Sequence, residues 1–126
     1  MINGAHVLLY SKDPDADRAF FRNVLQWRHV DAGHGWLIFK LPASEVAVHP
    51  LDGDPSQTHA GHAMIGAVLY LMCDNLDATL AALDAKRIGH TEIEKEPWGI
   101  RTTVVLPSGG EVGLYQPLHP TATTLA

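Results

Sequence analysis

The sequence predicts an α+β fold made of two tandem βαβββ modules. The chain nearly repeats itself: residues 6–16 pass from an apolar strand into the start of a helix, and residues 68–78 repeat that plan. Both halves also close alike, because the segments that begin at Glu45 and Glu111 read Glu-Val, then small or apolar residues, then an exit proline. Alternation of period two indicates the strands, and apolar residues three and four positions apart indicate the helices.

The first repeat, at about residues 4–50, begins with a strand in which alternate residues from His6 to Tyr10 share one face. Asp13 followed by a proline is typical of a helix start, and an apolar stripe predicts that the helix covers about residues 14–25. Turn-forming residues then separate three short strands, which we expect at residues 27–31, 36–41 and 45–49.

The second repeat, at about residues 67–117, follows the same plan. A strand at 67–73 leads into a helix over about 76–87, which ends before Gly89. Three further strands are expected at residues 91–96, 101–106 and 111–115, and the tail after this repeat is expected to fray. Residues 51–66 are polar and rich in turn formers, and we interpret them as a linker between the repeats.

Size and composition narrow the class of protein. A length of 126 residues predicts a single domain over 1–126, and 46% hydrophobic with 18% charged residues places the chain among ordinary globular proteins. A net charge of −5 with scattered basic residues gives no basic patch, so no nucleic acid partner is expected. The sequence shows neither a membrane span nor a secretion signal, and its single Cys73 cannot form an internal disulfide; we expect a cytoplasmic protein without a membrane partner.

Three stretches carry a resemblance to a known family. Residues 6–13 resemble the opening strand of the vicinal oxygen chelate superfamily, which includes glyoxalases, bleomycin-resistance proteins and extradiol dioxygenases. Residues 97–101 resemble its bend before the penultimate strand, and residues 106–116 stand where the family has a turn followed by a strand with a Glu. The resemblance covers about residues 4–117. It implies a curved mixed sheet, a half-barrel cup with helices outside, around a small-molecule pocket, and it also implies a homodimer.

The resemblance also implies where metal ligands would lie, in the first and last strands of each unit. Carried over position by position, these are His6, Ala47, Val68 and Gly113. Only the histidine can bind a metal, so the usual site of two histidines and one carboxylate is absent.

Strand alternation leaves a displaced metal site open. His49 and Glu111 each lie two residues from a carried-over position and so point to the same side. With His6 they would form two imidazoles and one carboxylate, a set suited to a divalent metal such as Fe, Mn, Zn or Ni. Against this site, a shift of two residues moves the root of a side chain by roughly 7 Å along a strand.

Two functions remain open at this point. The first is an enzyme in which a metal on His6, His49 and Glu111 chelates neighbouring substrate oxygens, or in which His6 beside a carboxylate acts as a metal-free general base. The second is a metal-free protein that binds an aromatic or apolar molecule in the cup, and the missing ligands favour it. In either case the predicted ligand contacts are Tyr10, Tyr70, Tyr115 and Arg101.

Overall fold

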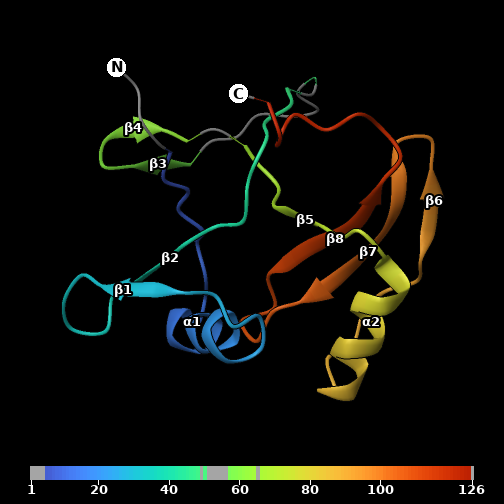
Figure 1. Cartoon of the computed structure of the whole chain (residues 1–126). Coiled ribbons are helices and arrows are strands. Elements are labelled where there is room, and N and C mark those ends of the chain that lie inside the picture. Colours follow the sequence, from blue (N-terminus) through green and yellow to red (C-terminus); the bar gives the residue numbers. More distant parts are fainter. Residues whose placement is uncertain (1–4, 49, 51–56, 65, 126) are drawn as a thin grey trace.

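The computed structural model of the chain describes residues 5–48, 50, 57–64 and 66–125 and confirms the predicted α+β class (Figure 1). Across these residues the elements run in the order α1 (Pro14–Asn23), β1 (His29–Asp31), β2 (Leu37–Phe39), β3 (Thr58–His59), β4 (His62–Ala63), β5 (Tyr70–Met72), α2 (Leu76–Ala85), β6 (Glu94–Glu96), β7 (Gly99–Val105) and β8 (Glu111–Pro117). None of the helices in the described ranges is long and apolar enough to cross a membrane.

The second repeat forms one mixed sheet of four strands, in the order β5-β8-β7-β6. β5 runs parallel to β8, and the other two pairs are antiparallel. The register places Tyr70 opposite Gly113 and Arg101 opposite Tyr115, which fixes the neighbours on each face of the sheet. This is the βαβββ arrangement that the sequence predicts for the second repeat.

Both helices begin directly after a capping residue, of which the sequence predicts Asp13. The side chain of Asp13 accepts a hydrogen bond from the backbone N–H of Ala16, and Asn75 does the same for Ala78. A proline follows Asp13 at the first helical position, where its missing N–H costs nothing. Each helix ends two residues earlier than predicted, a difference within the usual fraying of a last turn.

The hydrophobic core lies between the two helices and one face of the sheet. It consists of Phe20, Phe21, Leu76, Leu80, Leu83, Val104, Leu106, Val112 and Leu114. Asp17 of α1, also buried, accepts hydrogen bonds from the backbone N–H and the hydroxyl of Ser108, at 3.1 and 2.7 Å. The first helix is therefore fixed to the turn between β7 and β8, and the opposite face of the sheet is free of this core.

The first repeat differs from the prediction. β1 and β2 form an antiparallel hairpin, but residues 5–10 and 45–48 are not strands, and no described hydrogen bond joins their backbones to another segment. A strand is stable only beside an aligned partner, and within the described chain neither segment has one. The expected linker also contains a hairpin, β3–β4, and the hydroxyl of Tyr10 contacts Nδ1 of His59 there.

Candidate functional site

An aromatic cluster, defined as Tyr70, Trp98 and Tyr115, lies on the sheet face away from the core. Val112 and Leu114 of β8 enter the core, so alternation turns Gly113 and Tyr115 to the other face. The ring centroids are 5.8 Å apart for Tyr70 and Trp98, 5.5 Å for the two tyrosines and 5.4 Å for Trp98 and Tyr115, each pair edge to face. This is the geometry in which aromatic rings attract one another.

Two glycines make room for these rings. A Cβ atom at Gly113 would overlap the ring of Tyr70, and one at Gly99 would lie 2.8 Å from Cδ2 of Tyr115. The tyrosine rings therefore lie close against the glycine backbone. Tyr115 ends up buried, with 8% of its surface exposed, while Tyr70 and Trp98 each keep 38% exposed. The cluster thus presents two accessible rings on a closely packed base.

His119 extends the cluster from the chain beyond β8. Its ring stacks on Tyr115 at 5.9 Å between centroids, and its Nδ1 lies 2.7 Å from the carbonyl oxygen of Pro120. Because a carbonyl only accepts, Nδ1 carries the proton, and Nε2 is left to accept the hydroxyl of Tyr115 at 3.1 Å. Burial raises the pKa of Tyr115, and the nearby Glu45 and Tyr70 raise it further, so the phenol stays neutral.

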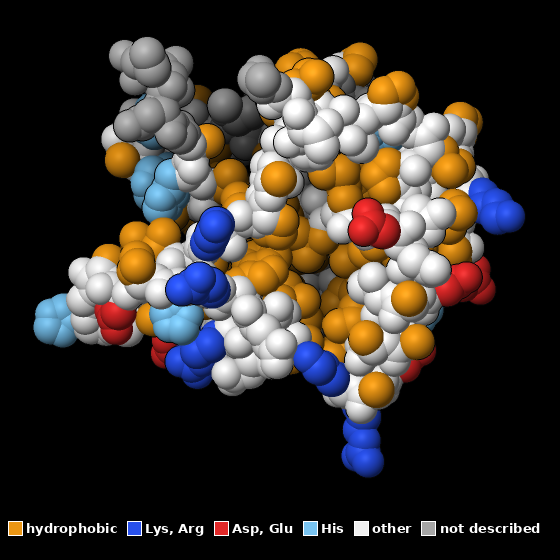
Figure 2. Space-filling model, in the orientation of Figure 1, with side chains coloured by type: hydrophobic (Ala, Val, Ile, Leu, Met, Phe, Trp, Pro, Cys, Tyr) orange, Lys and Arg blue, Asp and Glu red, His pale blue; other side chains and the backbone are white. Residues whose placement is uncertain are grey.

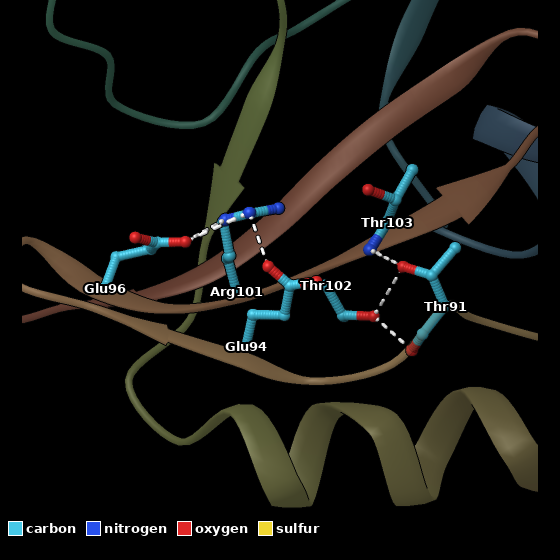
Figure 3. A network of polar contacts seen from close by, with 6 residues as sticks. All are labelled: Thr91, Glu94, Glu96, Arg101, Thr102 and Thr103. Atoms are coloured by element: carbon cyan, nitrogen blue, oxygen red, sulfur yellow. Dashed lines mark hydrogen bonds and ion pairs between the residues drawn. The ribbon is translucent and has the colours of Figure 1, made fainter.

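Arg101 lies on the same face, between two carboxylates. Its guanidinium donates to Glu96 at 3.0 and 3.2 Å and to Glu94 at 2.7 Å, as the dashed lines in Figure 3 show. The hydrogen bond to Glu96 raises the pKa of the arginine, which therefore remains charged. Glu94, Glu96 and Arg101 together carry a formal charge of about −1. An anionic ligand that contacts Arg101, as predicted, would have to compete with the two glutamates for its guanidinium.

The remaining predicted site residues lie apart from the cluster or outside the described part of the chain. His6 and Tyr10 are exposed on the segment 5–10, and Tyr10 contacts His59 rather than the cluster. Glu111 is exposed at the start of β8, and His49 lies outside the described residues.

The metal positions carried over from the resemblance do not fit a metal. Val68 has no donor atom, and the ring of Tyr70 covers the place where a side chain would leave Gly113. Among the residues that the structure describes, no group of three or more His, Cys, Asp or Glu side chains could hold a metal ion. The displaced set with His49 stays a prediction, since one of its members lies outside those residues.

Sequence reasoning missed two contributors to this site. His119 falls in the tail that was expected to fray, yet Leu118 donates to the carbonyl of Trp98, and Ala122 donates to Glu45 from the same tail. No spacing pattern marks His119. Trp98 was interpreted as marking a backbone bend, and its contact with Tyr115 requires the pairing of β7 with β8.

Comparison with known proteins identifies related sequences and folds. The family model described as Glyoxalase/Bleomycin resistance protein/Dioxygenase superfamily matches residues 4–110. The crystal structure of TnmS3, an antibiotic binding protein from Streptomyces sp. CB03234, is similar with a TM-score of 0.60 and 21% identity, over 93% of this chain and 99% of that one. No significant match to a curated protein was found.

Two further solved structures share the fold. Lactoylglutathione lyase from Agrobacterium tumefaciens aligns with a TM-score of 0.62 at 19% identity, over 90% of this chain and 92% of that one. A glyoxalase/dioxygenase from Nostoc punctiforme aligns with a TM-score of 0.53 at 15% identity, over 94% of this chain and the whole of the other. At these identities the likeness establishes the fold.

Proposed function

Because the chain belongs to the glyoxalase/bleomycin resistance protein/dioxygenase superfamily, we propose that it binds a small aromatic or apolar molecule and that its inherited metal site is degenerate. The aromatic cluster carries this proposal. Tyr70 and Trp98 are half exposed on an open sheet face, and Tyr115 beneath them is fixed by His119. Exposed rings that are already oriented lose little conformational entropy on binding, which favours a flat apolar partner.

The surface around the cluster supports the same class of ligand. The hydrophobic side chains in the middle of Figure 2 lie between the regions where Figure 1 shows α1 and α2, which is the core side of the sheet, and the cluster lies on the other face. Arg101, on the same face as the cluster, is engaged by Glu94 and Glu96, which weakens its attraction for an anionic compound. A neutral or weakly basic aromatic molecule suits these surroundings best.

The side chains at the carried-over metal positions support ligand binding without a metal. The alternative, a metal-dependent enzyme of the dioxygenase or lyase type, requires His6, His49 and Glu111 to meet, and no observation among the described residues favours it. Of the similar structures, TnmS3 is named as an antibiotic binding protein, whereas the Agrobacterium protein is named as a lyase. Because the carried-over metal positions of this chain lack donor atoms apart from His6, we propose a binding protein rather than a lyase.

Isothermal titration with two matched probes tests the proposal. 1-Naphthol and decahydro-1-naphthol share a skeleton and a hydroxyl, but only the first is aromatic. We expect the chain to bind 1-naphthol about 2- to 13-fold more tightly, because an aromatic contact contributes about 0.5–1.5 kcal/mol beyond its area. Trp98→Leu should remove that preference, whereas Trp36→Leu should keep it, because Trp36 is exposed on the β1–β2 connection.

Metal content separates the proposal from its alternative. Protein purified without chelator is analysed for metal and then offered Fe(II), Mn(II), Zn(II) and Ni(II). The proposal expects 1-naphthol binding that does not change on metal addition. Stoichiometric metal that is lost on His6→Ala, together with failure to bind either naphthol, would overturn the proposal in favour of the enzyme.

The functional unit that we propose is a homodimer. Fifteen large hydrophobic side chains of the described chain are exposed, Val7 to Tyr10 and Val46, Val48, Val68 and Tyr70 among them. The consecutive exposed apolar run from Val7 to Tyr10 supports an interaction surface on this segment.

A further inference from the structure

Two histidines face each other across the β3–β4 hairpin. His59 and His62 flank the turn Ala60-Gly61 and are paired directly in the antiparallel register. Residues that are paired in this way point to the same side of a hairpin, and the centroids of the two imidazole rings lie 6.1 Å apart. In the sequence the two histidines lie in a stretch interpreted as a linker, where a spacing of three residues is a weak signal. The turn between β3 and β4 brings their rings together.

An oxygen atom lies against Nδ1 of each ring. Nδ1 of His62 lies 3.1 Å from the carbonyl oxygen of Ala63, and Nδ1 of His59 contacts the hydroxyl of Tyr10. Because a carbonyl only accepts, Nδ1 of His62 carries the proton and Nε2 holds the lone pair. A phenol accepts as well as donates, so the same tautomer is open to His59. Within the described part of the chain, neither Nε2 atom has a hydrogen-bond partner.

This arrangement has the form of a pair of metal ligands. A histidine that binds a metal ion through one ring nitrogen usually donates the N–H of the other to an oxygen atom, which fixes the tautomer and the direction of the ring. Ala63 supplies that oxygen to His62, and Tyr10 supplies it to His59. Both rings are exposed, so an ion reaches their Nε2 atoms without any rearrangement of the core.

We propose that His59 and His62 bind one divalent cation of borderline softness, such as Zn(II) or Cu(II), through their Nε2 atoms. Imidazole nitrogen suits these ions, whereas Mg(II) and Ca(II) prefer oxygen ligands. Two protein ligands leave the remaining coordination positions to water. The net charge of −5 favours a cation at an exposed site. The site shares no residue with the carried-over metal positions or with the displaced set of His6, His49 and Glu111.

Tyr10 is a positioning residue of this site. With the ion on Nε2 of His59, Nδ1 carries the proton and donates it to the hydroxyl oxygen of Tyr10. Residues 5–10 have no described backbone hydrogen bond to another segment, and Figure 1 shows them beside the hairpin. The ion therefore strengthens the contact that holds this segment to the hairpin.

Isothermal titration of protein without a purification tag, with ZnCl₂, CuCl₂ or MgCl₂, is the first test. The wild type should bind one Zn(II) per chain, should bind Cu(II) more tightly, and should not bind Mg(II). His59→Asn and His62→Asn should each lose this binding. His34→Asn is the matched control, because His34 is equally exposed but lies on the β1–β2 connection. A wild type that binds no Zn(II), or an equal loss in His34→Asn and His62→Asn, would overturn the inference.

The imidazole signals in a long-range proton–nitrogen correlation spectrum are the second test. Zn(II) added below one equivalent should shift the Nε2 signals of His59 and His62 and leave that of His34 in place. Tyr10→Phe keeps the ring but removes the oxygen beside His59, so it should weaken Zn(II) binding about 10-fold. Shifts spread over all the histidines would refute the site, and an unchanged affinity of Tyr10→Phe would refute the role of Tyr10.

This site is separable from the metal-dependent alternative of the proposed function. His6→Ala should keep Zn(II) bound, and His62→Asn should keep the binding of 1-naphthol, because neither substitution touches the other site. Zn(II) that is lost in His6→Ala and kept in His62→Asn would refute the hairpin site in favour of the displaced set.

Discussion

At the scale of single residues, Gly113 determines where Tyr70 can lie. The ring of Tyr70 rests on the backbone of Gly113, where any Cβ atom would overlap it. Because Gly113 has no side chain, it offers no metal donor, and it leaves space for an aromatic ring. One glycine thus removes the donor from a metal position that the resemblance implies and makes room for the aromatic surface that we propose as the binding site.

Adding a Cβ atom at Gly113 tests whether this position determines where the ring of Tyr70 lies. Gly113→Ala should lower the free energy of unfolding by about 1–3 kcal/mol, because the ring of Tyr70 must move out of a packed position. Gly89→Ala should change it by less than about 0.5 kcal/mol, since a Cβ there meets nothing within 4 Å. Urea denaturation measures both. A cost for Gly113→Ala that persists in a Tyr70→Ala background would contradict the account.

Tyr115 should make the protein sensitive to high pH. Its pKa is raised above 10.0 in the folded chain, chiefly by burial, so the folded state holds the phenolic proton more tightly than the unfolded state does. This contribution is complete below pH 10 and is lost as the pH rises through the pKa of the folded state. The stability of the wild type should therefore fall more steeply above pH 10 than that of Tyr115→Phe, measured by urea denaturation across this range.

Strand alternation predicted the shared face of Tyr70 and Tyr115, because it is a local property of the backbone. The place of His119 could not be predicted in this way. Its stacking on Tyr115 and its bond to the hydroxyl depend on the path of the tail, which is set by the contacts of Leu118 with Trp98 and of Ala122 with Glu45.

At the scale of elements, the turn between β7 and β8 fixes α1 to the sheet. Asp17 is buried and accepts two hydrogen bonds from Ser108, a residue far along the chain. These two hydrogen bonds join the first repeat to the second, so they couple α1 to the turn before β8, the strand that carries Gly113 and Tyr115.

Removing this bond should destabilise the fold measurably. Asp17→Ala is expected to lower the free energy of unfolding by about 1–3 kcal/mol, because the polar groups of Ser108 lose their partner in a partly buried place. Asp15→Ala on the same helix is the control, since its ion pair with Arg18 is exposed and should contribute less than about 1 kcal/mol. Equal effects of the two substitutions in urea denaturation would contradict the assigned role of Asp17.

The elements of the second repeat were predictable and those of the first only in part. The cap at Asp13 and the apolar stripes located the helices, because both signals come from neighbouring residues alone. Residues 5–10 have the pattern of a strand, but pattern does not supply a partner, and pairing is not a local property. The β3–β4 hairpin was missed because its turn, Ala60-Gly61, has positive φ angles of 49° and 82° without the Asn-Gly or Asp-Gly pair that usually marks such a turn.

At the scale of the whole molecule, the family and the α+β class followed from the repeat, because a duplicated pattern is visible in the sequence. The sequence did not indicate that only the second repeat would form a complete sheet. One forms a four-stranded sheet within the chain, whereas the other leaves apolar segments exposed. The exposed apolar segments of the first repeat are the reason that we propose a homodimer.

The central claim is that the aromatic cluster is the binding surface, and the indole N–H signals of the three tryptophans in a proton–nitrogen correlation spectrum test it most directly. Trp27 stacks on Phe21, Trp36 lies against the guanidinium of Arg18, and Trp98 belongs to the cluster, so the chain carries its own controls. Titration with 1-naphthol should shift the Trp98 signal to saturation and leave the other two in place. A Trp98 signal that stays fixed, while the ligand binds or shifts Trp27 or Trp36, would contradict the account.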